Sequence, residues 1–540
     1  MSSKPQPRPV QDSQKSMSLS QTRESMWIAV HLPSLEMEVF VPHWQQAESA
    51  SAVVVLKQNR VIAMSAVALQ AGVRFGMRRG GVQMLIPEVQ IFMQDSIRES
   101  AALSAVALAL LRYTPQVSIA EDASILLDIG ASIRLFGGLS ALRQQVRATV
   151  NMLGYSLTTG SAPTAKAAWL FARNAALQQR QGQFCLRTSH LFAALDRLPV
   201  TLLNSSADWQ DFLQGLACHQ LADLRKLPRS GLQRRCGKDL ITEMDQVYSL
   251  RSSAQLWVLA EPEFHAKLEL PDRLDSTDAL FTYSRSLLCQ LLGWLNAQKL
   301  AVKHIRLELQ HERGRLAVPA TILDIHMAVA SWQETHLLPL FKEKLGNLSL
   351  PASVITLMLS APQTVALEVP SDSLFPETVV NPANHQHLLT LLVARLGASH
   401  VLRPGSKEDH RPEIANQWIS VMENHSASGK NSIPTSAPTS LPSLPSLPSL
   451  LRPTWLLAKA IALEVRRHKP YFGSELNLIS PAERIEAGWW SDQTQVRDYF
   501  VAISAEHVRY WIYRERPSHA NNADNADNAE PAWFLHGIFG

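Results

Sequence analysis

Several features that define common protein classes are missing from this sequence of 540 residues. Its four cysteines are scattered and form no Cys-x-x-Cys pair, which disfavours both a disulfide framework and a zinc site. No apolar run is long and clean enough to span a bilayer. The phosphate-binding Gly-x-x-x-x-Gly-Lys loop and the zinc motif His-Glu-x-x-His are also absent, despite 18 histidines. We therefore expect a cytoplasmic protein in a reducing environment, with no metal ion and no cofactor.

Length and composition indicate a chain of several folded parts. A chain of 540 residues is too long for one hydrophobic core, and a hydrophobic content of 46% is typical of globular proteins. The net charge is only +4, but basic residues gather between positions 225 and 238. Residues 1–25 are rich in Ser, Gln and Pro and lack an apolar core segment, which predicts a disordered leader and not a signal peptide.

The most informative stretch is residues 121–130, EDASILLDIG, followed by RLFGG at 134–138. It resembles the catalytic strand of Y-family translesion DNA polymerases, which reads SIDEAFLD and continues to LFG. Alignment on Leu127 and Asp128 places Ala123 and Ser124 where the family has its Asp-Glu pair. The family's first metal-binding strand, HIDMDAFY, is matched by residues 28–36, with His31 and Pro33 in the two Asp positions.

The resemblance implies that the metal carboxylates are missing. Two Mg²⁺ ions, held by carboxylates and triphosphate oxygens, normally offset the charge on the attacking and leaving oxygens. Alanine offers no ligand and proline offers only a carbonyl. Shifting the second strand by two residues keeps the same face inward and puts Glu121 and Asp122 in the acidic position. That register requires a compensating gap before Leu127, and the first strand still supplies no acid.

The positions that would contact an incoming triphosphate agree with this interpretation. The family's fingers carry a Tyr and an Arg where this chain has Ala66 and Leu69, so a hydrogen bond and a charge-assisted fork are lost. Both lysines of the family's palm motif are replaced by uncharged residues within 160–169. Lys166 lies one position away and is a candidate to compensate.

Four further blocks resemble one subgroup, the ImuB-type proteins: GVRFGM at 72–77, LPRSGLQRRCG at 227–237, PAERIEAGWW at 481–490 and WFLHGIF at 533–539. The last two lie outside an ordinary Y-family (UmuC-like) polymerase. The resemblance spans residues 26–540. It implies an α/β (α+β) multidomain fold with a ferredoxin-like palm, small fingers, a helix-hairpin-helix thumb and a little finger, followed by a tethered aromatic-rich tail.

The expected parts follow one another along the chain. They are the leader (1–25), palm (26–40 and 95–185), fingers (41–94), thumb (186–255), little finger (256–368), a clamp-motif segment and connector (369–424), a Ser/Pro/Leu linker (425–453) and a C-terminal partner-binding region (454–540).

The thumb carries the expected DNA contacts. A helix over 216–224, a tight hairpin over 227–232 and a second helix would present backbone N–H groups to a phosphate, with flanking cations adding sequence-independent attraction. A solvated charged face is the alternative interpretation. The predicted DNA-binding residues are Arg225, Lys226, Arg229, Ser230, Gly231, Arg234, Arg235 and Lys238.

A short polar segment before the tail resembles a ligand of the β sliding clamp. Such ligands follow a Q-x-x-L-F pattern, in which two adjacent apolar side chains enter a pocket. Ser371 replaces the Gln here, and the alternative is a loop whose apolar pair packs on its own domain. The predicted clamp-binding residues are Ser371, Asp372, Ser373, Leu374 and Phe375.

The tail follows a Ser/Pro/Thr/Leu-rich tether that cannot bury enough apolar surface to fold. It is either a small β-rich domain with an aromatic core, with paired strands at 496–501 and 508–513, or a docking segment, since chain ends usually fray. The resemblance implies docking to the RecA-like partner ImuA and to an error-prone DnaE-type polymerase. The candidate partner-binding residues are Trp489, Trp490, Trp533, Phe534 and Phe539.

Together these features predict a non-catalytic adaptor of DNA damage tolerance. It would bind damaged primer–template DNA and the sliding clamp, and recruit the DnaE-type polymerase for SOS-induced mutagenic translesion synthesis, becoming nucleoid-associated when bound. One alternative is an active translesion polymerase that uses Glu36, Glu121 and Asp122 as displaced acids. Another is a free-standing DNA-binding repair protein that does not contact the clamp.

Overall fold

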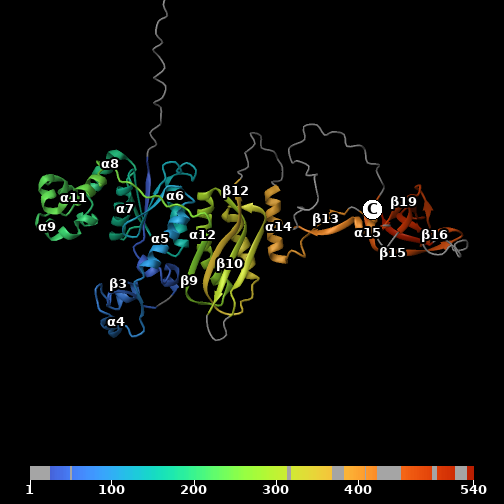
Figure 1. Ribbon diagram of the computed structural model, residues 1–540, viewed down its shortest axis with the longest axis horizontal. Helices are drawn as coiled ribbons and strands as arrows, with labels where there is room; N and C mark the ends of the chain where they lie inside the picture. The colour runs from blue at the N-terminus through green and yellow to red at the C-terminus, as the bar shows by residue number, and fades with distance from the viewer. Residues whose placement is uncertain are drawn as a thin grey trace, which may run out of the picture. The chain divides into compact units, whose positions relative to one another are not determined.

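The structure is a computed structural model of the chain (Figure 1), which describes residues 25–48, 51–312, 318–367, 382–407, 409–421, 452–488, 490, 495–516 and 532–539. The clamp-like residues 371–375, almost all of the leader and of the linker, and Trp489 lie outside the described residues. The chain forms two compact units, residues 1–395 and 396–540, and each is described by itself. In the described part, no helix has the length and apolar character needed to cross a membrane.

A five-stranded central sheet organises the first unit, with strand order β5-β6-β1-β7-β8. Its strands are β1 (Trp27–His31), β5 (Val117–Ala120), β6 (Ser124–Asp128), β7 (Thr158–Ala162) and β8 (Gly182–Phe184). Alternating side chains of β1 and β6 enter two cores, because successive residues of a strand point to opposite faces. One core is covered by α5 (Ser96–Leu110) and α6 (Leu139–Met152), and the other by α7 (Ala165–Leu177).

Helix α7 approaches β7 closely at a glycine. A Cβ atom on Gly160 would lie 1.9 Å from the carbonyl oxygen of Ala168, so no larger residue fits there. This contact holds α7 against the middle of the central sheet, where Gly160 lies opposite Ala29 of β1.

A smaller sheet of order β3-β2-β4 lies in the region predicted as fingers (Figure 1). Two short helices precede this sheet in the chain, and two more lie between its last two strands in chain order. The elements are α1 (Leu35–Glu38), α2 (His43–Glu48), β2 (Val53–Lys57), β3 (Arg60–Met64), α3 (Ala66–Gln70), α4 (Arg79–Leu85) and β4 (Gln90–Met93).

The region predicted as thumb is helical, with α8 (Thr188–Asp196), η1 (Val200–Leu202), η2 (Asn204–Trp209), α9 (Gln210–Gly215), α10 (Leu221–Lys226) and α11 (Arg229–Val247). The predicted helix over 216–224 is wrong at its start, since Ala217 is left-handed and a capping box between Gln220 and Asp223 begins α10. The predicted hairpin is shorter than 227–232, because Pro228 is the N-cap of α11 and the chain is already helical beyond it. Helix α11 is kinked at Gly237, whose φ is +85°.

A second sheet of order β11-β10-β12-β9 fills the region predicted as little finger. Its elements are β9 (His265–Leu274), α12 (Thr277–Gln298), β10 (Leu300–His311), β11 (Thr321–Ser331), α13 (Glu334–Gly346) and β12 (Val354–Ala366). Helices α12 and α13 share one core with the sheet. Helix α12 also packs on α5, where Gly293 permits contact with the backbone of Leu108.

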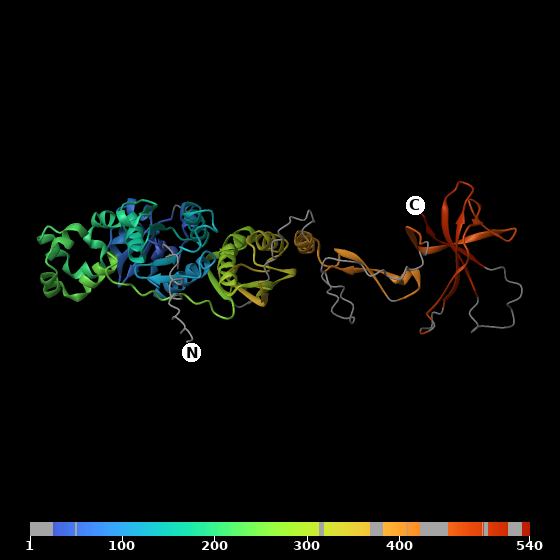
Figure 2. The ribbon, with the colours of Figure 1, turned by 90° about the horizontal axis from the view of Figure 1, so that it is seen from above.

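The second unit is rich in strands (Figure 2). The strands β20 (Gln495–Ile503) and β21 (Arg509–Glu515) pair antiparallel. β20 contains the strand predicted at 496–501, and β21 contains the strand predicted at 508–513 except for its first residue. They belong to an eight-stranded sheet of order β17-β16-β15-β22-β21-β20-β18, with β19 paired to β20. The other strands are β15 (Trp455–Arg466), β16 (Lys469–Phe472), β17 (Ser474–Glu475), β18 (Asn477–Leu478), β19 (Glu483–Ala487) and β22 (Trp533–Ile538).

The segment predicted as a connector, 369–424, contains folded elements that the sequence analysis missed. They are α14 (Pro382–Leu396), the hairpin of β13 (Leu402–Ser406) and β14 (Asn416–Ser420), and α15 (Pro412–Ala415). The mixed α/β multidomain class predicted from the sequence is confirmed.

Candidate functional site

The residues predicted to replace the metal carboxylates lie together at one end of the central sheet. Strands β1 and β6 pair antiparallel, and the register sets His31 opposite Ser124. Ala123 precedes β6 and Pro33 follows β1, where its ring is exposed. The strand pairing thus brings the four predicted positions to one place, as the resemblance implied.

His31 and Ser124 bind to the same backbone carbonyl. The Nδ1 atom of His31 lies 2.8 Å from the carbonyl oxygen of Asp122 and 3.1 Å from the Ser124 hydroxyl oxygen, and that hydroxyl donates to the same carbonyl at 2.9 Å. Burial lowers the pKa of His31, and the hydrogen bond to the carbonyl only partly opposes this. A neutral imidazole with its proton on Nδ1 satisfies this geometry, and its Nδ1 then has no lone pair for a metal ion.

The acidic pair Glu121 and Asp122 lies in the turn before β6. Asp122 and Ala123 both have left-handed backbones, with φ of +52° and +46°. The Asp122 carboxylate forms an ion pair with Arg173 at 3.2 Å, and the Glu121 carboxylate accepts a hydrogen bond from Asn204 at 2.8 Å. Both acids are therefore engaged by α7 and η2.

The third acid of the polymerase alternative, Glu36, has different neighbours. Its pKa is raised by burial and by the charge of Glu99, with Lys57 opposing the rise. The structure shows no contact that joins it to Glu121 or Asp122 among the described residues. Nor does any group of three or more His, Cys, Asp or Glu residues in the described part form a set able to hold a metal ion.

The indole of Trp169 is the centre of a polar cluster on α7. Lys166 Nζ lies 3.8 Å and Arg173 Cζ 4.5 Å from the centroid of its ring system, both within cation–π range. Its Nε1 donates to the carbonyl of Glu121 at 3.2 Å. Lys166, the candidate to replace a missing palm lysine, also forms an ion pair with Glu243 of α11 at 3.0 Å.

Glu243 is held from several sides. Its carboxylate accepts hydrogen bonds from the backbone N–H of Ser205 at 3.0 Å and from the Ser205 hydroxyl at 2.6 Å. Burial by itself would raise the pKa of Glu243, but these hydrogen bonds and Lys166 outweigh it and lower the pKa. The carboxylate is thus ionised, and it ties α7 and η2 to α11.

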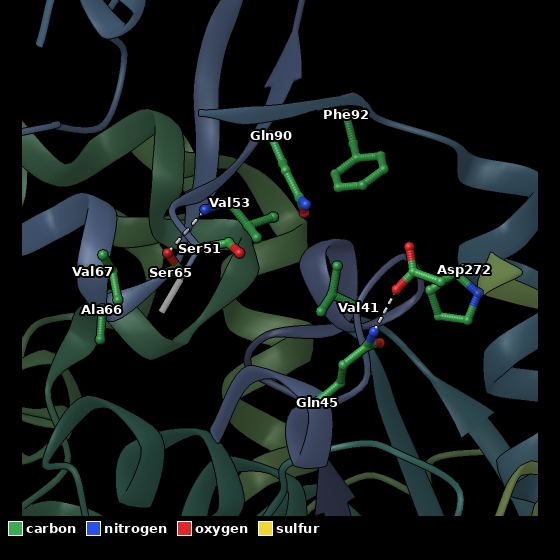
Figure 3. A pocket seen from close by; sticks show the side chains of 11 residues that line it. Val41, Gln45, Ser51, Val53, Ser65, Ala66, Val67, Gln90, Phe92 and Asp272 are labelled. Atoms are coloured by element: carbon green, nitrogen blue, oxygen red, sulfur yellow. Dashed lines mark hydrogen bonds between the residues drawn. The ribbon is translucent and has the colours of Figure 1, made fainter. Parts of the chain in front are cut away.

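A cavity of about 410 Å³ lies between the small sheet, α2 and β9 (Figure 3). Gln45 Nε2 donates to Asp272 at 2.7 Å on one side, and Ala66 stands on the other. No Lys or Arg is among its lining residues, and Asp272 would repel phosphate, so the cavity is poorly suited to a nucleoside triphosphate. Its lining residues are Val41, Gln45, Ser51, Val53, Ser65, Ala66, Val67, Gln90, Phe92, Pro271 and Asp272.

The predicted DNA-binding residues of the helical region are all exposed, but their charges differ in availability. Arg229 is engaged by both oxygens of Asp245 at 2.7 and 2.8 Å. Arg225 and Lys226 pair with Asp196 at 3.0 Å and Asp223 at 3.4 Å. Arg235 lies over the ring of Phe212, 5.2 Å from its centroid.

Arg234 and Lys238 form no ion pair with any described residue. They lie on either side of the kink at Gly237, in the helix whose exposed first turn holds Ser230 and Gly231. These two cations and that first turn are therefore the strongest candidates for phosphate contact.

The candidate partner-binding residues of the tail divide into core and surface. Trp533 is only 7% exposed and packs in one core of the sheet, while Phe534 and Phe539 pack against the other. Trp490 is 54% exposed. The sequence analysis assigned Trp533 to partner binding, but its burial gives it a packing role, because strand β22 is a central member of the sheet. Partner binding by the other residues stays a prediction.

Comparison with known proteins finds relatives that match most of the chain. The ImuB proteins of two Caulobacter vibrioides strains are each 24% identical to it over 490 residues, which is 86% of this chain and 99% of theirs. The chain is a homologue of ImuB. Residues 37–173 also match the impB/mucB/samB family. The chain is thus an ImuB-like protein.

Solved structures with detectable similarity include a complex of Dbh and the protein DinB. The Dbh chain of a ternary complex is 14% identical to this chain, with a TM-score of 0.36. The match covers 63% of this chain and 99% of the Dbh chain. DinB from Sulfolobus solfataricus is 13% identical to this chain, with a TM-score of 0.35. The match covers 62% of this chain and 98% of DinB.

Proposed function

We propose that this protein is a non-catalytic adaptor that binds primer–template DNA and brings a separate error-prone polymerase to damaged sites. The observation that carries the proposal is the pairing of His31 with Ser124 at the end of the central sheet, where the polymerase resemblance calls for metal carboxylates. The polar atoms there bind the carbonyl of Asp122, and the nearby acids are paired with Arg173 and Asn204. A metal ion would have to displace these contacts and would gain few ligands.

In this proposal, the helical region from α8 to α11 (188–247) binds the DNA. The first turn of α11 offers the backbone N–H groups of Arg229 and Ser230 to a phosphate, whereas the N–H of Gly231 donates to the carbonyl of Pro228. Arg234 and Lys238 supply charge that no described acid neutralises. Phosphate contacts of this kind position a protein on DNA without reading its sequence. An adaptor that works at many lesions needs that property.

The partners in this proposal are the β sliding clamp, a RecA-like protein of the ImuA type and an error-prone DnaE-type polymerase. Support for the clamp is the sequence of residues 371–375, and support for the others is homology to ImuB. In the tail, the exposed Trp490 is the preferred contact for a partner.

Reconstitution with the clamp and a DnaE-type polymerase on a lesion-containing template tests this function. We expect the full chain to increase lesion bypass by that polymerase, and the double variant Leu374→Ala/Phe375→Ala to lose both clamp binding and the increase. Leu388→Ala, at an exposed leucine of α14, is the matched control and should behave as the parent chain. Clamp binding and bypass that both survive in the double variant would contradict the adaptor role at the clamp.

A further inference from the structure

Four neighbouring strands of the second unit place a row of side chains on one face of the sheet. In the pairing register, Arg484 of β19 lies opposite Asp498 of β20, Asp498 lies opposite Arg514 of β21, and Arg514 lies opposite Trp533 of β22. Arg516 follows directly after β21. Residues that lie directly opposite one another share a face, so three arginines are gathered around one carboxylate.

Asp498 is buried and accepts a hydrogen bond from each arginine. Its side chain is 1% exposed. One carboxylate oxygen accepts from Arg484 Nε at 2.9 Å, and the other accepts from Arg516 Nε at 2.7 Å and from Arg514 Nη2 at 3.3 Å. Burial opposes ionisation of this carboxyl, but the three hydrogen bonds outweigh burial and lower its pKa.

The arginines outnumber what the buried carboxylate requires. One guanidinium is enough to neutralise a buried carboxylate, and each additional guanidinium repels the first. Glu486 reaches Arg484 Nε at 4.0 Å, so among the described residues three guanidinium groups face two carboxylates, which leaves one net positive charge. The side chains of Arg484, Arg514 and Arg516 are 48%, 31% and 46% exposed, so this charge is presented to solvent.

The donor geometry favours an anionic ligand. Arg484 and Arg516 use Nε for Asp498, which leaves the terminal amino groups of both guanidinium forks available. Arg514 is further oriented by the ring of Trp533, with its Cζ 5.8 Å from the ring centroid. A planar carboxylate is satisfied by one arginine fork, whereas the oxygens of a tetrahedral phosphate accept from several guanidinium groups at once.

We propose that Arg484, Arg514 and Arg516, held by Asp498, form a phosphate-binding site for the backbone of single-stranded DNA. A phosphodiester carries a single negative charge, which matches the net charge of the cluster. The site gives the second unit its own contact with DNA, separate from the helical region of the first unit. This inference deepens the proposed function, because it adds a second contact to a chain already proposed to act on DNA.

Binding of a fluorescent oligothymidylate to the full chain, measured by anisotropy over a series of salt concentrations, tests the proposal. The background carries Arg234→Gln/Lys238→Gln, so that the helical region contributes less. Adding Arg484→Gln/Arg516→Gln should weaken binding about tenfold, as expected for lost hydrogen bonds to a charged group. It should also reduce the slope of log K against log salt by about 0.7, the value for one phosphate of a single strand.

Two controls keep the result interpretable. Arg466→Gln removes an exposed arginine of the same unit, which is engaged by Glu464 at 2.7 Å and by the ring of Tyr471, and it should leave affinity unchanged. Arg484→Lys/Arg516→Lys keeps the charges but loses the forks, so we expect weaker binding with an unchanged salt slope. This lysine variant decides the matter if the glutamine variant unfolds.

Unchanged affinity and unchanged slope in both variants would overturn the site. Competition by oligoglutamate as strong as that by unlabelled DNA would also overturn it, and would assign the cluster to an acidic peptide. The variant Arg234→Gln/Lys238→Gln of the helical region reports separately on the proposed function. The site stands if this variant leaves primer–template binding intact while the Arg484/Arg516 variants weaken oligothymidylate binding. The same result would contradict the proposed DNA binding by the helical region.

Discussion

Lys166 of α7 and Glu243 of α11 form an ion pair with 3.0 Å between Nζ and Oε1. The lysine that lies nearest to the position of a triphosphate-binding palm lysine is thus turned toward the helical region. Its side chain is 18% exposed and that of Glu243 is 10% exposed, so water screens the pair only partly. The contact links α7 and α11 within the same unit.

Glu243→Gln should therefore destabilise the packing of α11 on α7. The change leaves Lys166 without its carboxylate, and the expected loss is about 2 kcal/mol, below the range for a fully buried pair. Hydrogen exchange of amides in α7 and α11 measures it. Glu475→Gln, which removes the exposed partner of Lys469, should cost less than about 0.5 kcal/mol. Equal protection in the Glu243 variant and the parent chain would contradict this role.

The same pair predicts a pH dependence. The folded chain lowers the pKa of Glu243 below its ordinary value of 4.5. The stabilisation it supplies is therefore present above that pH and is lost as the pH falls through the lowered pKa. The difference in unfolding free energy between the parent chain and Glu243→Gln should shrink as the pH drops below 4.5. A constant difference down to the acid transition would show that the carboxylate is not specially stabilised.

His31 should titrate at lower pH than an ordinary histidine. Burial lowers its pKa below 6.5, so the imidazole is neutral at pH 7 and hydrogen bonded to the carbonyl of Asp122. NMR titration of the His31 Cε1–H resonance, assigned with His31→Gln, measures this value. A pKa at or above 6.5 would mean that the imidazole is solvated or paired with an acid, and the hydrogen bonding described for this end of the sheet would be wrong.

Arg234→Gln/Lys238→Gln should weaken binding to primer–template duplex without unfolding the helical region. Each lost phosphate contact on duplex DNA reduces the salt slope by about 0.9, so the double variant should show a reduction of about 1.8. Filter binding or anisotropy at several salt concentrations measures it. Lys342→Gln, at an exposed lysine of α13, is the matched control. A double variant that follows the control would remove these two residues from the DNA contact.

The sequence predicted local features of the fold better than contacts between distant segments. The sequence predicts paired strands at 496–501 and 508–513, and the structure pairs them in β20 and β21. The contacts of Lys166 with Glu243, and of Asp498 with three arginines, depend on helix packing and strand register that no single segment encodes. Trp533 was assigned to a partner because it lies near the chain end, but β22 is inserted between β15 and β21 and buries it.

The sequence predicts which positions would replace the metal carboxylates, because these positions lie within short motifs. It does not predict their partners, since Arg173 and Asn204 reach the turn before β6 only after α7 and η2 pack against it. The left-handed backbone of Ala123 also has no sequence signal, because Gly, Asn and Asp are the residues that usually adopt it.

Primer extension by the purified full chain alone, on undamaged and lesion-containing templates with Mg²⁺ or Mn²⁺, tests the central claim most directly. A binding measurement on the same DNA accompanies it. The account predicts that the chain binds the primer–template and adds no nucleotide. Extension that is lost in the variant Glu121→Gln/Asp122→Asn would contradict it, and would show that the acids of the turn before β6 hold catalytic metal ions.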